Sequence, residues 1–515
     1  MGNNNSAGHN KKEKSRGSMS NEVPHEPGGL LLSPTIQQPL TVRGMTRSPS
    51  GADIHDKLHT QFVPVEKLAK ILVKRTEHEF NVTGIVSDVF IKYVFPRYPD
   101  LGARLFHYFY MQSHAKTKYL GATAFRQQCE RFLGILDDQI ILEAYIRMFS
   151  DPESDQCTVD GVKALLRTCF QLAMAHYSEG ATTCLSIEKT LDAVITSCFF
   201  QQPLTVGFVA RWLEQNCPRL VPPVHRYCIH TLSTTYRSIE EGSEKNGCGL
   251  ELATPILEKG SLFLESPPLL TISVAWLLAG ALPGSYSRPQ SAAAAQATSN
   301  KDDTAHTSVA LPSQAFLTKL LSVVPSHWTL LYDTRQHGVG ANRFLHHVLG
   351  YRGPTLIMLE AKSSKDNSEM IFCVAAPTEW RETTLYAGGE DGCLIQLQPK
   401  FQLMEKGAKI LYLNTSIRGY PKGLRVAVDP RNPIIAIDEQ FEKLEVHSIA
   451  HTLQNIEVWG CGDQSSREVQ LDIKKWQIKE AERQRTVKLS ATEWIDHPDR
   501  YLLELSGRPQ YNNSN

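Results

Sequence analysis

The chain has 515 residues, 41% of them hydrophobic and 21% charged, and its 54 lysines and arginines balance its 54 aspartates and glutamates. This length exceeds one ordinary domain and favours two or three. The composition is typical of a soluble globular protein and argues against a disordered, fibrous or nucleic-acid-coating chain, so we expect no nucleic-acid partner.

The cysteines and the apolar runs exclude further classes. The 11 cysteines include no C-x-x-C pair and no Cys/His cluster at zinc-ligand spacing. We interpret them as reduced thiols that pack in a core, and we expect no bound metal. The longest apolar run, 269–282, has 14 residues, fewer than the about 20 that cross a bilayer. No secretory h-region follows the first residues, so we expect neither a membrane-spanning nor an exported protein.

The first residues carry a candidate lipidation signal. They read MGNNNS, which fits the pattern M-G-x-x-x-[ST] for attaching myristate to Gly2 once Met1 is removed. A basic patch follows, formed by Lys11, Lys12, Lys14 and Arg16. One myristoyl chain binds membranes weakly, and a basic patch facing anionic lipids is a common second signal. We therefore predict a disordered, myristoylated basic tether over 1–58; a solvated charged tail is the alternative.

Helical periodicity begins after the tether and predicts an all-α domain over 59–282. Apolar residues recur at spacings of three and four in 138–149 and again in 162–172. The segment between these helices, which begins at Asp151, has the outline of an EF-hand loop. Gln156 and Val162 occupy loop positions that require glycine and a bidentate glutamate. We predict an EF-hand-like helix pair kept for packing, without calcium.

The composition then changes twice. Residues 283–310 are rich in Ser, Ala, Pro and Gln, which predicts a flexible linker. Short apolar runs bounded by Gly, Pro, Asp or Asn follow it, with one helix at 341–349, and they predict a β-sandwich with flanking helices. The expected strands are 329–333, 354–361, 369–376, 392–397, 409–414, 424–428, 434–437 and 456–459.

Several of these segments carry a family resemblance. They read LLYDTRQHG at 330–338, GPTLIMLE at 353–360, AGGEDGCLIQL at 387–397 and IEVWG at 456–460, with Phe344, Phe372 and Trp380 between them. In order and spacing this region, 311–463, resembles a TLDc domain. With its Met-Gly start, the architecture is most similar to the N-myristoylated, mTOR-associated branch of that family. The fold class that follows is α+β and multidomain.

The resemblance implies a function that the residues alone do not. TLDc proteins have no assigned active site; they are linked to oxidative-stress resistance and bind the peripheral sector of the vacuolar proton-pumping ATPase. The mTOR-associated branch acts with mTOR pathway components at lysosomal membranes. We therefore expect a cytoplasmic adaptor at the cytosolic face of membranes, including the lysosome, where an anionic membrane surface would meet the basic patch.

Enzymatic motifs are missing from the sequence. It contains no phosphate-binding loop, no G-x-S-x-G elbow and no H-E-x-x-H motif. We interpret Gly388, Gly389 and Gly392 as turn residues, and the adjacent His346 and His347 as surface or packing residues. We expect no catalytic residue and no cofactor. The alternatives left open are a calcium-responsive myristoyl-switch sensor and a Cys-dependent antioxidant enzyme.

The C-terminal region, 464–515, contains the one candidate partner site. Its helical part, 466–488, carries net positive charge and places Val469, Ile473 and Trp476 at spacings of four and three. Such a helix docks in a groove or lies on a membrane. We predict that Ile473 and Trp476 form a partner-binding surface; packing of the helix on its own domain is the alternative.

Overall fold

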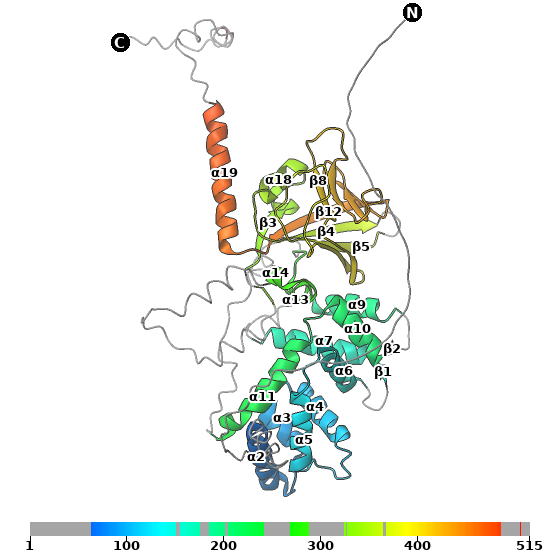
Figure 1. The fold of residues 1–515 in the computed structure, drawn as a ribbon, viewed down its shortest axis with the longest axis vertical. Helices are drawn as coiled ribbons and strands as arrows, with labels where there is room; N and C mark the ends of the chain where they lie inside the picture. Colours follow the sequence, from blue (N-terminus) through cyan, green and yellow to red (C-terminus); the bar gives the residue numbers. More distant parts are fainter. Residues whose placement is uncertain are drawn as a thin grey trace, which may run out of the picture. The chain divides into compact units, whose positions relative to one another are not determined.

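The computed structural model describes residues 63–150, 155–175, 184, 186–200, 204–240, 268–287, 324–325, 327–363, 367–485 and 505, within a compact unit that spans His59–Asn515. Helices occupy its first part and a large antiparallel sheet its second (Figure 1). This confirms the α+β prediction. We call residues 63–287 the helical domain and residues 327–485 the sheet domain. The predicted tether residues Gly2, Lys11, Lys12, Lys14 and Arg16 lie outside the described residues.

The helical domain contains two helices whose ends follow directly from the sequence. The Asp137 side chain accepts a hydrogen bond from the backbone N–H of Ile140 (3.0 Å) at the start of α6, and Thr158 accepts one from Gly161 (3.1 Å) at the start of α7. The elements of this domain are α2 Val63–Phe80, α3 Ser87–Val94, α4 Pro99–Gln112, α5 Ala122–Leu133, α6 Asp138–Phe149, β1 Gln156–Cys157, α7 Val159–Ala173, α9 Ile187–Cys198, β2 Leu204–Thr205, α10 Val206–Asn216, α11 Pro222–Glu240, α13 Ile272–Ala281 and α14 Gly284–Ser287.

The region of the predicted EF-hand-like pair contains two helix–strand–helix units. The two-residue strands β1 and β2 pair antiparallel, with Gln156 opposite Thr205, and so join α6–β1–α7 to α9–β2–α10. Residues 151–154 of the loop lie outside the described residues. Asp155 forms an ion pair with Arg147 (3.3 Å). Among the described residues no cluster of His, Cys, Asp and Glu could hold a metal ion, and the EF-hand-like description stays a prediction.

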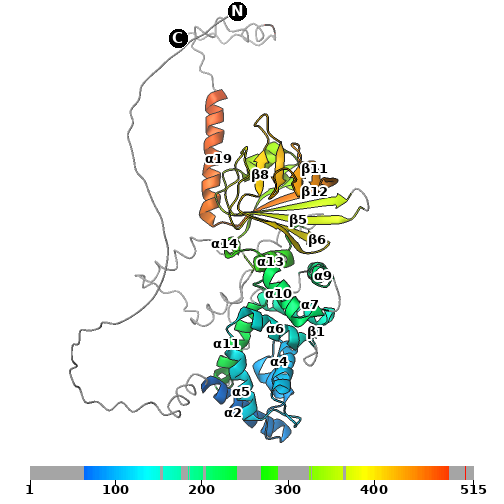
Figure 2. The same cartoon turned by 45° about the vertical axis from the view of Figure 1, so that its right-hand side comes forward.

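The sheet domain contains ten strands in one hydrogen-bonded sheet. Their order is β7-β6-β5-β4-β12-β11-β10-β9-β8, and β3 also pairs with β12. Figure 2 shows part of this order, with β6 beside β5 and β11 beside β12. The elements are β3 Thr329–Asp333, α17 Thr334–His337, α18 Ala341–Val348, β4 Thr355–Ser363, β5 Glu369–Ala376, β6 Cys393–Gln398, β7 Gln402–Lys406, β8 Leu411–Asn414, β9 Gly423–Val426, β10 Ile435–Ile437, β11 Lys443–Val446, β12 Ile449–Gly460 and α19 Gln464–Arg485.

The predicted β-sandwich describes the hydrophobic core correctly. It does not describe the hydrogen bonds between the strands, which join all of them into one sheet. Buried side chains of β4, β5 and β6 share one hydrophobic core with those of β8 to β11, as two facing layers do. The two layers are nevertheless continuous, because β12 is 12 residues long and pairs with β4 along one edge. Its other edge pairs first with β11 and then with β3. The strands therefore form one folded sheet instead of two separate ones.

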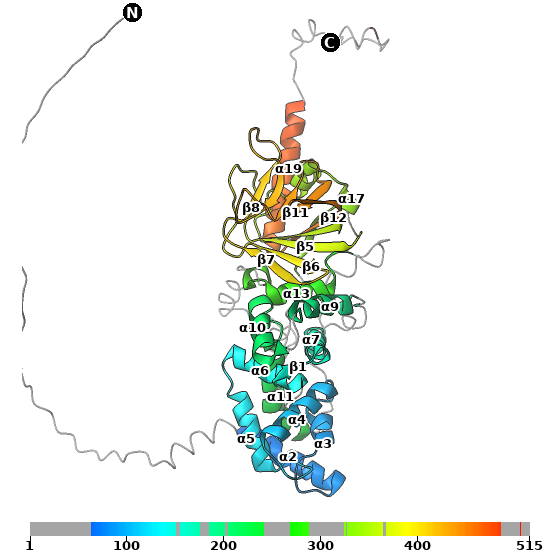
Figure 3. The same cartoon turned by 90° about the vertical axis from the view of Figure 1, so that its right-hand side faces the viewer.

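The opposite face of the sheet is buried against the helical domain. Leu356, Met358 and Cys373 point to this face and belong to the same hydrophobic core as the helices of the first domain. The backbone N–H of Phe401 donates to the carbonyl of Ala193 in α9 (2.9 Å), and Figure 3 shows α9 and α13 alongside β6. The two domains are consequently joined by a common apolar core in addition to the covalent chain.

The start of the predicted linker is ordered. Residues 284–287 form α14, and Tyr286 is fully buried. Its backbone carbonyl accepts a hydrogen bond from the indole of Trp328 (2.9 Å), and its hydroxyl donates to the carbonyl of Asp391 (3.1 Å). Residues 288–310 lie outside the described residues.

We predict that Gly423→Ala destabilises the sheet domain by about 2 kcal/mol. Gly423 begins β9 with a φ of +99°, and a Cβ there would lie 1.8 Å from the carbonyl oxygen of Ile437. Both the strained backbone and the overlap with a neighbouring strand oppose any side chain. Thermal unfolding would measure the effect; Gly419→Ala, which shares the positive φ but meets no atom within 4 Å, separates the two causes.

Candidate functional site

The C-terminal helix α19 packs on the sheet domain through its first turns. The amide of Gln470, which is fully buried, donates to the carbonyls of His347 (2.8 Å) and Leu349 (3.3 Å) at the end of α18. These carbonyls have no partner within their own helix, so Gln470 satisfies them in place of water. Ile473 lies on the same side, and its side chain approaches Gly350. The alternative interpretation, packing of the helix on its own domain, is correct for this half.

The two predicted partner-binding residues therefore differ in their exposure to solvent. Ile473 is partly buried at the contact with Gly350, whereas Trp476 is 65% exposed. Ile478 is exposed as well, and the side chains of 475–479 all lie in solvent. Helical spacing puts Ile473 and Trp476 on one face, but the domain ends before it covers Trp476. The structure leaves Trp476, and not Ile473, accessible to a partner.

Arg467 and Lys474 of α19 lie close to His347 of α18. The rings of His337 and His347 lie 3.9 Å apart between centroids. Burial, and then the neighbouring His337, lowers the pKa of His347 to about 4, and burial together with Arg467 lowers the pKa of Lys474 to about 8. Among the described residues, no carboxylate lies within ion-pair distance of Arg467 or Lys474. At neutral pH His347 is therefore uncharged, whereas the positive charges of Arg467 and Lys474 repel each other.

A buried carboxylate, that of Glu457, joins β12 and α17 of the sheet domain to the helical domain. Glu457 in β12 accepts hydrogen bonds from the backbone N–H groups of Leu269 (2.8 Å) and Leu270 (3.3 Å), which precede α13. It also accepts one from the indole of Trp459 (3.1 Å) and pairs with Arg335. Burial outweighs these partners and raises the pKa of Glu457 above its ordinary value. The segments 330–338 and 456–460, noted in the sequence, thus meet around one side chain.

The free edge of β8 is covered by residues 382–388, which we call the edge segment. Backbone hydrogen bonds join Thr383 to Leu413 (2.9 Å) and Ala387 to Leu411 (2.7 Å). The segment is fixed at one end by Glu382, which accepts hydrogen bonds from Thr415 (2.7 Å) and from the hydroxyl of Ser416 (3.0 Å). Covering an edge in this way prevents pairing with another chain.

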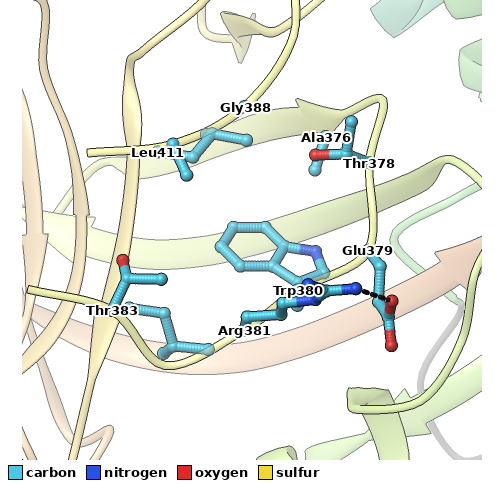
Figure 4. A pocket seen from close by; sticks show the side chains of 10 residues that line it. Ala376, Thr378, Glu379, Trp380, Arg381, Thr383, Gly388 and Leu411 are labelled. Carbon is cyan, nitrogen blue, oxygen red and sulfur yellow. Dashed lines mark hydrogen bonds and ion pairs between the residues drawn. The ribbon is translucent and has the colours of Figure 1, made fainter. Parts of the chain in front are cut away.

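A hollow of about 270 Å³ lies on the inner side of the edge segment. Figure 4 shows the ring of Trp380 at its centre, with Leu411 on one side and Thr378 on the other. The indole of Trp380 donates to Thr355 (2.8 Å), and Arg381 forms an ion pair with Glu379 (3.0 Å) at the rim. Trp380, Arg381 and Glu379 are thus already partnered, and they leave the hollow without an evident ligand chemistry.

The described thiols with a shifted pKa are packed and not activated. Among the described cysteines, Cys157 is partly exposed and the others are buried. Burial raises the pKa of Cys169, Cys373 and Cys393, and it also raises that of Cys157. A reactive cysteine instead needs a lowered thiol pKa.

Comparison with known proteins supports the resemblance found in the sequence. Residues 306–462 match the TLDc domain, a range that includes the ten strands' segments from β3 to β12 and the Arg335–Glu457 pair. The chain contains a TLDc domain. The sheet domain therefore contains the TLDc domain. Its closing Glu-Val-Trp sequence includes Glu457, which accepts hydrogen bonds from the segment before α13.

The relatives found are yeast proteins named "Restriction of telomere capping protein 5". The protein from Zygosaccharomyces rouxii is 23% identical, with 35% of this chain and 44% of that protein covered. The protein from Vanderwaltozyma polyspora is 24% identical, with 38% of this chain and 41% of that protein covered. The chain therefore spans less than half of the length of the curated relatives it matches.

The sequence signals missed two parts of this site. Glu457 was included only as part of the segment 456–460 that resembles a TLDc domain, although an acidic residue inside an apolar strand already indicates a buried partner. The edge segment gave no signal, because its pairing with β8 depends on a strand 24 residues further along the chain: Ala387 pairs with Leu411.

In the described part of the chain, none of the helices combines the length and the apolar character that a membrane span requires.

Proposed function

We propose that this protein is a non-enzymatic, lipid-anchored TLDc adaptor that regulates the vacuolar proton-pumping ATPase at endolysosomal membranes and takes part in mTOR-linked nutrient signalling and oxidative-stress resistance. Myristate on Gly2 and the basic residues Lys11, Lys12, Lys14 and Arg16 hold it at an anionic membrane surface. The TLDc domain and α19 bind the peripheral sector of the pump. The observation that carries the proposal is the TLDc domain at 306–462.

The exposed end of α19 supports a role in binding. Trp476 is 65% exposed on the part of the helix that its own domain does not cover. A large aromatic side chain costs little conformational entropy on binding and buries much area, so residues of this kind dominate interface energetics. Membrane anchoring raises the local concentration of the adaptor, and a modest affinity of the TLDc domain then suffices.

We predict that Trp476→Ala lowers the affinity for the pump roughly 30-fold, the loss of an interface anchor of about 2 kcal/mol. Capture of pump subunits from detergent-solubilised lysosomal membranes by the purified chain would measure it. Phe80→Ala is the matched control, because Phe80 is also an exposed aromatic residue, 47% exposed at the end of α2. Equal capture by both variants would exclude Trp476 as an anchor.

The anchor is tested separately with Gly2→Ala. In intact cells this variant should leave the lysosomal membrane fraction while the purified protein binds the pump as before. Point variants are preferable to deletion of 311–515, since that deletion would expose the apolar core that the helical domain shares with the sheet. Absence of pump subunits from every capture would contradict the proposal as a whole.

A further inference from the structure

A second hollow, of about 470 Å³, lies on the outer side of the edge segment. The strand β8 separates it from the first: Leu411 and Leu413 line the inner hollow, and Tyr412 lines the outer one. This alternation follows from the two-residue repeat of a strand. We call the outer hollow the edge pocket; the lining residues used below are Leu385, Tyr386, Lys409, Tyr412, Arg425 and Val428.

Two residues that line the edge pocket each carry a polar atom that is buried without a hydrogen-bond partner among the described residues. These atoms are Nε of Arg425 and the hydroxyl oxygen of Tyr386. The neighbouring Tyr412 differs, because its hydroxyl donates to the carbonyl of Pro421 (2.7 Å). A buried polar atom without a partner is costly, so native proteins rarely leave two of them together. Their presence in one pocket indicates a ligand that supplies hydrogen-bond acceptors.

The charges define that ligand further. Arg425 and Lys409, which are both cationic, line the pocket, and no carboxylate of the described residues lies within ion-pair distance of Arg425. Asp429 is the nearby acid; its side chain accepts from the backbone N–H of Arg431 (3.0 Å). Burial raises the pKa of Tyr386, so its hydroxyl keeps its proton as a donor. The guanidinium Nε of Arg425 and the hydroxyl of Tyr386 are two donors, which match the two oxygens of a carboxylate.

The rim of the edge pocket is apolar and exposed. Leu385 is 75% exposed and Val428 57% exposed, and the rings of Tyr386 and Tyr412 lie 5.1 Å apart between centroids. Tyrosine and arginine beside exposed aliphatic residues are the composition of protein-binding hot spots. An apolar rim favours a carboxylate that is carried by a peptide over a free anion.

We propose that the edge pocket binds an aspartate or glutamate side chain of a partner protein, in a segment with an apolar residue next to the acid. The carboxylate accepts hydrogen bonds from Arg425 and Tyr386, and the apolar neighbour packs on Leu385 and Val428. This site is separate from Trp476, and it would exist whether or not the proton pump is the partner.

The test is selection of a random heptapeptide display library on the full-length protein, in parallel with Arg425→Gln. The wild type should enrich peptides with Asp or Glu beside Leu, Ile, Val or Phe, and Arg425→Gln should not enrich them. Arg418→Gln is the matched control, since Arg418 is exposed in the loop between β8 and β9 and does not line the pocket; it should enrich the same peptides as the wild type. Enrichment without an acidic residue, or no difference between Arg425→Gln and Arg418→Gln, overturns the proposal.

An enriched peptide is then measured by fluorescence anisotropy. Replacing its acid by the matching amide, or Arg425 by Gln, should weaken binding at least about tenfold. Tyr386→Phe removes only the unpartnered hydroxyl, so it should weaken binding several-fold without lowering the melting temperature, which keeps the test independent of folding. If inorganic phosphate competes as well as the peptide does and the amide peptide binds equally, the pocket is a site for free anions and the proposal fails.

Discussion

Replacing Glu457 by alanine should destabilise the protein by about 3–5 kcal/mol, the usual cost of removing one partner of a buried ion pair. The substitution leaves the N–H groups of Leu269 and Leu270 and the indole of Trp459 without their acceptor, in a place that water does not reach. Chemical denaturation followed by circular dichroism would give the free energy of unfolding. Hydrogen exchange should also become faster at Leu269 and Leu270, since both amides lose their acceptor.

The control for this prediction is Glu445→Ala. Glu445 is a glutamate of the same sheet, in β11, and its side chain is exposed. Surface substitutions of this kind change stability by no more than about 0.5 kcal/mol. If Glu457→Ala cost no more than Glu445→Ala, the carboxylate would not hold the TLDc domain to the segment before α13.

Acid should destabilise the helical domain through His225 by about 3 kcal/mol between pH 6.5 and pH 4. His225 is buried, with its ring 4.9 Å from that of Phe132 between centroids. Burial lowers the pKa of His225 to about 4, against smaller opposing effects of Ile135 and Asp138. A histidine with a lowered pKa resists protonation in the folded state only, so its contribution to stability is present above pH 6.5 and is lost as the pH falls toward 4.

The measurement is the free energy of unfolding of the wild type and of His225→Phe at several pH values from 7 to 4. The variant cannot be protonated at this position, so its stability should fall by about 3 kcal/mol less than that of the wild type over this range. His78→Phe replaces an exposed histidine of α2 and should keep the wild-type slope. Parallel curves for the wild type and His225→Phe would show that His225 is protonated as easily in the folded state as in the unfolded state.

The elements predicted correctly are those with a strong local pattern. The runs 329–333 and 369–376 coincide with β3 and β5, and 138–149 coincides with α6. The strands β7 and β11 were missed, because Gln402–Lys406 and Lys443–Val446 are short and half polar. β7 is an edge strand, where polar residues are compatible with pairing on one side only. The first half of β12 was missed for the same reason, since its residues are mostly exposed.

The candidate sites could be predicted less well than the fold, because they join distant segments. Glu457 is 188 residues from Leu269 and 122 residues from Arg335, and no local pattern indicates which residues a buried carboxylate will meet. Trp476 could be identified from its position in an amphipathic helix. Its exposure depends on where the domain surface ends, and this in turn depends on the contact of Gln470 with α18.

The position of β12 has a consequence for how the chain folds during synthesis. This strand comes last in the TLDc domain, yet it pairs with β3, β4 and β11 and carries Glu457. Until residues 449–460 leave the ribosome, β3 has no partner strand and the meander β4 to β7 lacks its inner neighbour. Pairings between segments so far apart in sequence form slowly. The nascent chain therefore exposes the apolar faces of β4 and β5 while residues 377–460 are being made, which is the period in which a chaperone would be needed.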